Sequence, residues 1–285
     1  MIAVVVAAAA CEEIEREPSI RYYIPPDAGA DVTRPIPDAA VADADADADV
    51  PLDASDDADA ASSYDPGELS LSGWWRAPTA ATWVGEKSAG TSATRNLAEA
   101  TNPPAAGAAV NGFVPADFDG TNDVLANPSP LASLVNASSW SCVLLVNLDA
   151  VSTANSSGAL EMLSDSRGYW TLGSWNNPTP RAVIGQFDGA QRTVETAMNL
   201  GEWSLVQAKF DGAMLRLRVN SGAWATAASN NIQVTTGTLN VGKNYTSTLF
   251  FNGKMLELML STTAFPDATF DDIKAYVNAR YALAL

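Results

Sequence analysis

The chain has 285 residues and a formal net charge of −17 at pH 7, and it contains no histidine. The lack of histidine excludes Ser-His-Asp and Cys-His nucleophilic sites and histidine metal ligands, and two cysteines, Cys11 and Cys142, cannot build a cysteine zinc site or a disulfide framework. The acidic balance argues against nucleic acid and an anionic lipid surface as partners, because each would require a basic face.

Residues 1–11 form a signal-like segment. Met1 to Ala10 are apolar and end in small residues directly before Cys11, which is similar to bacterial lipoprotein signals, in which the cysteine is acylated. We therefore predict lipidation at Cys11 and an exported protein that is anchored to the cell envelope by lipid and does not span the membrane. Because the run lacks Lys and Arg, an ordinary secretory signal or a cytosolic N-terminus are the alternatives.

Residues 12–63 are predicted to be a disordered acidic linker. Residues 12 to 65 hold sixteen of the chain's 33 Asp and Glu residues but only three of its 16 Lys and Arg residues. The stretch 42–50, ADADADADV, alternates charge with a methyl group, and alanine buries too little area to offset chain entropy while the aspartates repel one another. A calcium-binding repeat is the alternative, although the glycines and closing glutamate of a calcium loop are absent.

Residues 64–285 are predicted to form one all-β domain, a two-sheet antiparallel sandwich with one C-terminal helix. Short apolar segments alternate with Gly, Asn, Asp and Pro turns. The clearest strands are expected at residues 141–148, 168–175, 181–187, 192–198, 203–210, 213–220, 224–227, 238–242 and 254–261. Asp211-Gly212 and Asn220-Ser221-Gly222 predict tight hairpins, because these residues tolerate positive φ.

Alternation of side chains predicts which strand faces are buried. In segment 213–220, Leu215 and Leu217 share one face while Arg216 and Arg218 share the other, so we expect one core face and one partly polar face. In segment 254–261 apolar residues occupy most of both faces, which predicts a strand covered on both sides. Upstream, the packing of a first strand accounts for three tryptophans, Trp74, Trp75 and Trp83.

After residue 261 the apolar period changes from two to about 3.6 residues, which predicts a helix. One stripe of this helix carries Phe270, Ile273, Val277 and Tyr281. Thr269 is the predicted N-cap. We expect this helix to cover one end of the sandwich.

Segment 211–280 contains DGAMLRLRVNSGAW, LNVGKN, FFNGKMLELMLSTTAF and FDDIKAYVNARYAL, and residues 116–125 read ADFDGTNDVL. The first group resembles the closing half of concanavalin A-like (laminin-G-like) jelly-roll domains of bacterial surface proteins, and the second resembles the strand-turn-strand that opens them. The matching stretches cover about 170 residues in the right order. The resemblance implies a jelly roll and makes carbohydrate the expected class of ligand.

Glycosidases of the same fold carry Glu-x-Asp-x-x-Glu on one strand, and retaining catalysis needs two carboxyl groups about 5 Å apart. This string is absent from the sequence, and Glu161 with Asp165 is the nearest equivalent. Residues 164–167 predict a turn, which would take Asp165 out of the sheet. We therefore expect a protein that is not an enzyme, with a glycosidase as the least favoured alternative.

A calcium site is one interpretation of the turn at residues 117–123. The resemblance implies calcium at the sandwich rim, and hard oxygen ligands crowd this turn, foremost Asp119, Asn122 and Asp123. The alternative is an ordinary tight turn in which Asp119 and Asn122 bond their own backbone. No other cofactor is expected.

Sugar recognition commonly uses aromatic faces beside amides and carboxylates. Tyr169 and Trp175 share one side of their predicted strand and Asn176 follows, so these three are the predicted ligand-binding residues, while Trp170 and Cys142 are interpreted as core. The sequence thus predicts a monomeric, non-catalytic binding or adhesion module of the cell surface with a surface glycan as its partner. A structural envelope protein without a glycan ligand is the alternative.

Overall fold

The computed structural model of the chain describes residues 64–79, 82–88, 96–98, 102–126, 137–151, 160–164, 170–176, 179–230, 239–243 and 249–285. The predicted signal-like segment, with Cys11, and the predicted linker lie outside these residues. Among the described residues, no helix is long and apolar enough to cross a membrane.

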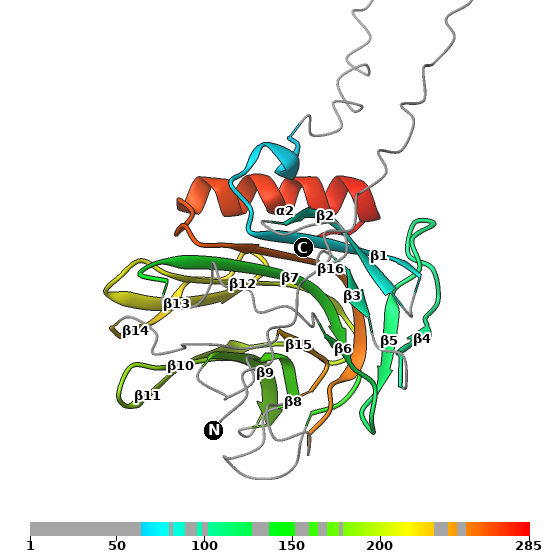
Figure 1. The fold of residues 1–285 in the computed structure, drawn as a ribbon, viewed down its shortest axis with the longest axis horizontal. Coiled ribbons are helices and arrows are strands. Elements are labelled where there is room, and N and C mark those ends of the chain that lie inside the picture. Colours follow the sequence, from blue (N-terminus) through cyan, green and yellow to red (C-terminus); the bar gives the residue numbers. More distant parts are fainter. Residues whose placement is uncertain are drawn as a thin grey trace, which may run out of the picture. The chain divides into compact units, whose positions relative to one another are not determined.

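The strands pair antiparallel and fold into two layers (Figure 1). In the first sheet, from one edge inward, are β14 (Ala225–Ala228), β13 (Met214–Val219), β12 (Trp203–Phe210), β7 (Trp140–Leu148), β16 (Asn252–Ser261), β1 (Gly73–Thr79) and β2 (Thr82–Ser88), with β5 (Ala116–Asp119) and β4 (Ala105–Ala106) continuing from the other half of β16. In the second are β11 (Gln191–Ala197), β10 (Pro180–Phe187), β9 (Trp170–Asn176), β8 (Leu160–Ser164), β15 (Asn240–Val241), β6 (Leu125–Ala126) and β3 (Leu97–Ala98). The predicted fold class, an all-β jelly-roll sandwich with one C-terminal helix, is confirmed.

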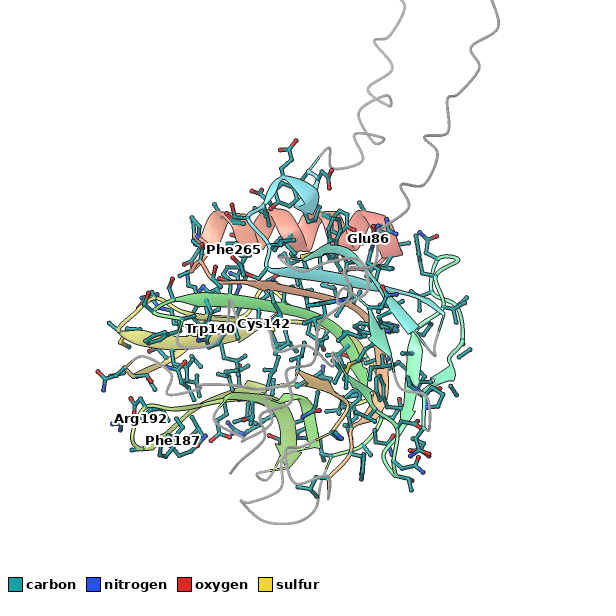
Figure 2. All side chains as sticks on the ribbon, viewed as in Figure 1. Glu86, Trp140, Cys142, Phe187, Arg192 and Phe265 are labelled. Atoms are coloured by element: carbon teal, nitrogen blue, oxygen red, sulfur yellow. The ribbon has the colours of Figure 1, made fainter. Side chains whose placement is uncertain are left out.

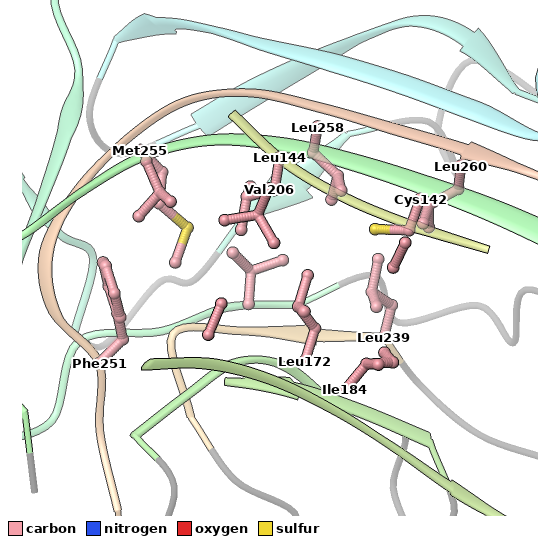
Figure 3. Packing of buried hydrophobic residues seen from close by; sticks show 14 of the residues in the cluster. Cys142, Leu144, Leu172, Ile184, Val206, Leu239, Phe251, Met255, Leu258 and Leu260 are labelled. Atoms are coloured by element: carbon pink, nitrogen blue, oxygen red, sulfur yellow. The ribbon is translucent and has the colours of Figure 1, made fainter. Parts of the chain in front are cut away.

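The main hydrophobic core lies between the two sheets. Alternate residues of β7, β12 and β16 point from the first sheet toward Leu172, Ile184 and Leu239 of the facing layer (Figure 3). Trp75 and Trp83 are fully buried in this core, as the sequence predicted. Cys142 is fully buried too, and this burial raises the pKa of its thiol, as expected for a structural cysteine.

Helix α2 (Asp267–Tyr281) lies across the outer face of the first sheet (Figure 1). The predicted stripe is confirmed, because the buried residues of the helix are Phe270, Ile273, Val277 and Tyr281. They pack on Trp74, Val143, Leu145, Leu205, Leu256 and Met259. The expectation that the helix covers one end of the sandwich is therefore wrong. As a result both faces of β7 are buried along its whole length.

The helix begins two residues before the predicted N-cap, Thr269. Its N-cap is Pro266, which makes no side-chain capping hydrogen bond. The first turn is instead fixed by ion pairs with buried cations of the sheet: Lys209 Nζ lies 2.6 Å from Asp267, and Arg218 lies 2.7 Å from Asp271. These pairs explain how Lys209 of β12 and Arg218 of β13 can be buried under a helix.

Near its other end, α2 is attached through the fully buried carboxyl group of Glu257 on β16. Trp74 Nε1, Tyr276 Oη and Tyr281 Oη all donate hydrogen bonds to this group. Burial raises the pKa of Glu257, and the hydrogen bonds from Tyr281 and Trp74 act in the opposite direction. A titratable group is thus enclosed between sheet and helix.

A short 3₁₀ turn, η1 (Pro66–Glu68), precedes β1. The predicted strands are all present, and each of their ends lies within two residues of the predicted position. The bounds of β12 match the prediction. Both predicted hairpins are present, with positive φ at Gly212 and Asn220.

Candidate functional site

The two outer faces of the sandwich differ in what they present to solvent. Helix α2 covers much of the first sheet, whereas no described element packs over β9, β10 and β11 (Figure 1). In these strands Leu172, Ile184 and Val194 point into the core. The residues between them therefore form the outer face of the second sheet. Its described side chains come from Thr171, Arg181, Val183, Thr193, Glu195 and Ala197, with Gly173 and Gly185 between them.

Gly185 creates a low point on this face. It pairs with Thr171 on one side and with Thr193 on the other. A Cβ atom at residue 185 would lie 2.8 Å from Thr171 Oγ1 and 2.7 Å from Gln191 Nε2, so these two polar side chains lean over the glycine. A hydroxyl and an amide group therefore stand above a floor of bare backbone.

A charged pair lies further along β10 and β11, on the same face as Gly185. Arg181 and Glu195 approach to 3.7 Å, and their side chains are 33% and 34% exposed. A half-exposed pair of this kind contributes little to stability, because solvent screens it. Val183 pairs directly with Glu195 and is buried at 4% exposure. The face thus presents mainly hydrogen-bond donors and acceptors.

Two of the three predicted ligand-binding residues, Trp175 and Asn176, have their backbone at the edge of this face. The backbone of β9 pairs Trp175 with Arg181 and Asn176 with Pro180. The side chains of Trp175 and Asn176, and the whole of Tyr169, lie outside the described part of the structure. Their role in binding stays a prediction, while the position of Trp175 beside Arg181 is established.

Sequence reasoning missed the polar members of the face. Thr193 and Glu195 alternate with Val194 in RTVETAM, and Arg181 alternates with Ala182 in RAVIGQF. This alternation indicates that the polar residues lie on the outer face of their strands, but it does not indicate which strands are neighbours in the sheet.

The tip of the β10–β11 hairpin is held by a polar network. Trp140 Nε1 of the first sheet donates to Gln186 Oε1 at 3.0 Å, and Gln186 Nε2 donates to Asn230 O at 2.6 Å. The carboxylate of Asp188 accepts from the backbone N–H of Asn230 at 2.8 Å, and this hydrogen bond is the first cause that lowers the pKa of Asp188. Figure 2 shows Phe187 and Arg192 at this tip and Trp140 on the sheet above. The network fixes the hairpin against the first sheet.

For the glycosidase alternative, the structure describes the backbone of one of the two carboxyl residues. Glu161 lies in β8 and pairs with Gly173 of the same sheet. Its side chain and Asp165 lie outside the described residues, so this alternative stays a prediction.

The turn at residues 119–123 has the hydrogen bonds of an ordinary tight turn. Asp119 Oδ1 accepts from the backbone N–H groups of Thr121 at 2.7 Å and Asn122 at 3.3 Å. Asp123 Oδ2 accepts from the N–H of Asp119 at 2.8 Å. In the described part of the chain, no group of three or more Asp, Glu or Cys residues is placed to hold a metal ion. Calcium at Asp119, Asn122 and Asp123 stays a prediction.

No protein-family profile matches the sequence, and no curated protein matches it. Among solved structures, the chain is similar to the Trypanosoma rangeli sialidase in complex with sialic acid, with a TM-score of 0.50 and 11% identity over 72% of this chain and 33% of the sialidase. The match thus spans about a third of the sialidase's length. This likeness shows the fold.

Two further structures are more distant. Domain 4 of AbnA, a GH43 extracellular arabinanase from Geobacillus stearothermophilus, in complex with arabinotriose, has a TM-score of 0.47 and 12% identity over 64% of this chain and 82% of that domain. The heptameric SAP-like pentraxin from Limulus polyphemus has a TM-score of 0.42 and 11% identity over 57% of this chain and 80% of the pentraxin.

Proposed function

We propose that residues 64–285 form a non-catalytic carbohydrate-binding module that binds a surface glycan on the outer face of the second sheet. The observation that carries this proposal is the polar surface around Gly185, where Thr171 and Gln191 lean over bare backbone beside the pair of Arg181 and Glu195. Sugars are recognised by hydroxyl, amide and charged groups of this kind placed around a small apolar or aromatic surface. In the proposal, Trp175 and Asn176 supply the aromatic and amide groups at its edge, and Tyr169 is the third predicted ligand-binding residue.

The experiment is a glycan array probed with the full chain and with two variants, Trp175→Ala and Arg181→Ala. Both variants should lose about tenfold or more in affinity, because truncating an aromatic or arginine hot spot costs about 2 kcal/mol or more and each 1.4 kcal/mol is a factor of ten. The matched control is Arg216→Ala, which removes an arginine of the same 33% exposure, paired with Asp211, from the other sheet. Binding that stays at background for the wild type, or that survives both site substitutions in folded protein, would overturn the proposal.

We also propose that Cys11 is acylated and that residues 12–63 act as a tether, so that the module stands away from a bacterial envelope. The acidic, alanine-rich composition of the segment supports an extended linker. The measurement is intact mass after detergent extraction of the full chain, with Cys11→Ser as the control. A protein that still begins at Met1 and carries no lipid contradicts the anchor but leaves the glycan site untouched.

A further inference from the structure

A row of four residues crosses one end of the outer face of the first sheet. Asp117 of β5 lies opposite Lys254 of β16, Lys254 lies opposite Asn147 of β7, and Asn147 lies opposite Trp203 of β12. Residues directly opposite each other in antiparallel strands have Cβ atoms about 4.5–5.5 Å apart. These four residues, named the Trp203 row, therefore form one continuous surface.

The Trp203 row begins where the packing of α2 ends. The last residues of these strands that pack under the helix are Leu145, Leu205 and Leu256, and the row lies two positions further along the same face. Trp203 is half-buried against this packing. It forms no aromatic pair or cation–π contact with any other residue in the described part of the chain. Part of an indole surface thus remains without an aromatic or cationic neighbour.

Asn147 carries a polar atom that the folded chain does not satisfy. The residue is 9% exposed, and its Nδ2 donates to Gly201 O at 3.1 Å. Its Oδ1 is buried and accepts no hydrogen bond from any residue that the structure describes. An unpaired buried acceptor costs about 1–3 kcal/mol, so the amide retains an unmet need for an O–H or N–H donor.

Charged groups surround this amide. Lys254 forms ion pairs with Asp149 and, at 3.8 Å, with Asp117, and these side chains are 25% to 38% exposed. Lys254 stands directly opposite Asn147 in the register and has a flexible side chain. Two carboxylates against one ammonium leave the surface with a negative balance.

We propose that the Trp203 row is a second carbohydrate-binding site, specific for a neutral sugar ring. The exposed part of the Trp203 indole packs against the C–H face of the ring, one ring hydroxyl donates to Asn147 Oδ1, and a neighbouring hydroxyl accepts from Lys254 and donates to Asp149. Asp117 and Asp149 repel carboxylated sugars. The ligand class is that of the proposed function, but the site lies on the other sheet and depends on different residues.

The experiment titrates the full chain with the short neutral oligosaccharide that binds best on an array of neutral and sialylated glycans. Trp203→Ala should lower the affinity about tenfold or more and remove one ligand per chain from the stoichiometry. Asn147→Leu should lower the affinity as well, while its melting temperature stays close to that of the wild type, because removing the unpaired buried acceptor offsets the loss of the hydrogen bond to Gly201 O. The matched control is Trp224→Ala, which truncates another half-buried tryptophan of the same face, packed edge-to-face against Phe270, and should leave binding unchanged.

The outcomes separate this site from the first one. Loss of binding in Trp203→Ala with full binding in Arg181→Ala supports the Trp203 row and overturns the second-sheet site. The reverse pattern overturns the Trp203 row. So does a wild type that binds only sialylated glycans, or an Asn147→Leu variant that melts well below the wild type and binds normally.

Discussion

Replacing Phe270 by alanine tests whether α2 is an integral layer of the fold or a separable cover. Phe270 is fully buried and packs edge-to-face against Trp224, with ring centroids 5.2 Å apart, and against Phe265 at 5.7 Å. Truncating a buried phenylalanine costs about 3–5 kcal/mol, and the two ring pairs place this site toward the upper end. For a domain of this size, such a loss lowers the melting temperature by about 10 °C or more.

The assay is urea unfolding of the full chain, followed in parallel by tryptophan fluorescence and by the helical far-UV signal. The two signals should coincide in wild type and variant, because β7, β12 and β16 contribute residues to the packing on both faces of the first sheet. Ala275→Gly, on the exposed side of the same helix, is the control and should cost about 1 kcal/mol. A helical signal lost at lower urea than the fluorescence signal, or a cost for Phe270→Ala below that of the control, would refute the reasoning.

Three further predictions concern buried polar groups. Because the folded state raises the pKa of Glu257, the contribution of this residue to stability is present at acid pH and is lost as the pH rises from the ordinary glutamate value through the folded value. Glu257→Gln should therefore flatten this part of a plot of melting temperature against pH. An unchanged profile contradicts this prediction. The pKa of Asp188 is lowered, so its contribution to stability is present above the ordinary aspartate value and is lost as the pH falls through the folded value. The loss of unfolding free energy in Asp188→Asn, measured by urea unfolding, should therefore shrink in acid. A loss that is constant with pH counts against the network at the hairpin tip. Ser174 is fully buried, and its Oγ has no hydrogen-bond partner among the described residues. Ser174→Ala should therefore raise the free energy of unfolding by about 1 kcal/mol, and a clear loss of stability would show that the hydroxyl is satisfied.

The sequence predicted the faces of elements better than their partners. The stripe of α2 and the core face of β13 were predicted correctly, because alternation and helical period report which side of an element is buried. They do not report what covers it. The position of α2 could have been inferred from β16, whose two apolar faces require a cover on each side.

The sequence also failed to predict the burial and the partner of a charged residue. The sequence placed Arg218 on a partly polar face, but the residue is buried, and its partner Asp271 lies 53 residues away in the chain. Likewise, the outer face of the second sheet is assembled from three strands whose neighbours are set by the sheet. Two-residue strands such as β3 and β15 have too few positions to show any period. Long-range pairing is the information that a local pattern lacks.

The pairing of β1 with β16 has a consequence for how the protein is made. Trp74 and Glu257, which meet across these strands, are 183 residues apart. A ribosome must therefore synthesise nearly the whole domain before the first sheet can close, and closure over such a separation is slow. Until β16 arrives, one edge of β7 and its apolar residues have no partner, which exposes the nascent chain to aggregation. Closure of the first sheet therefore depends on a strand that is made near the end of synthesis.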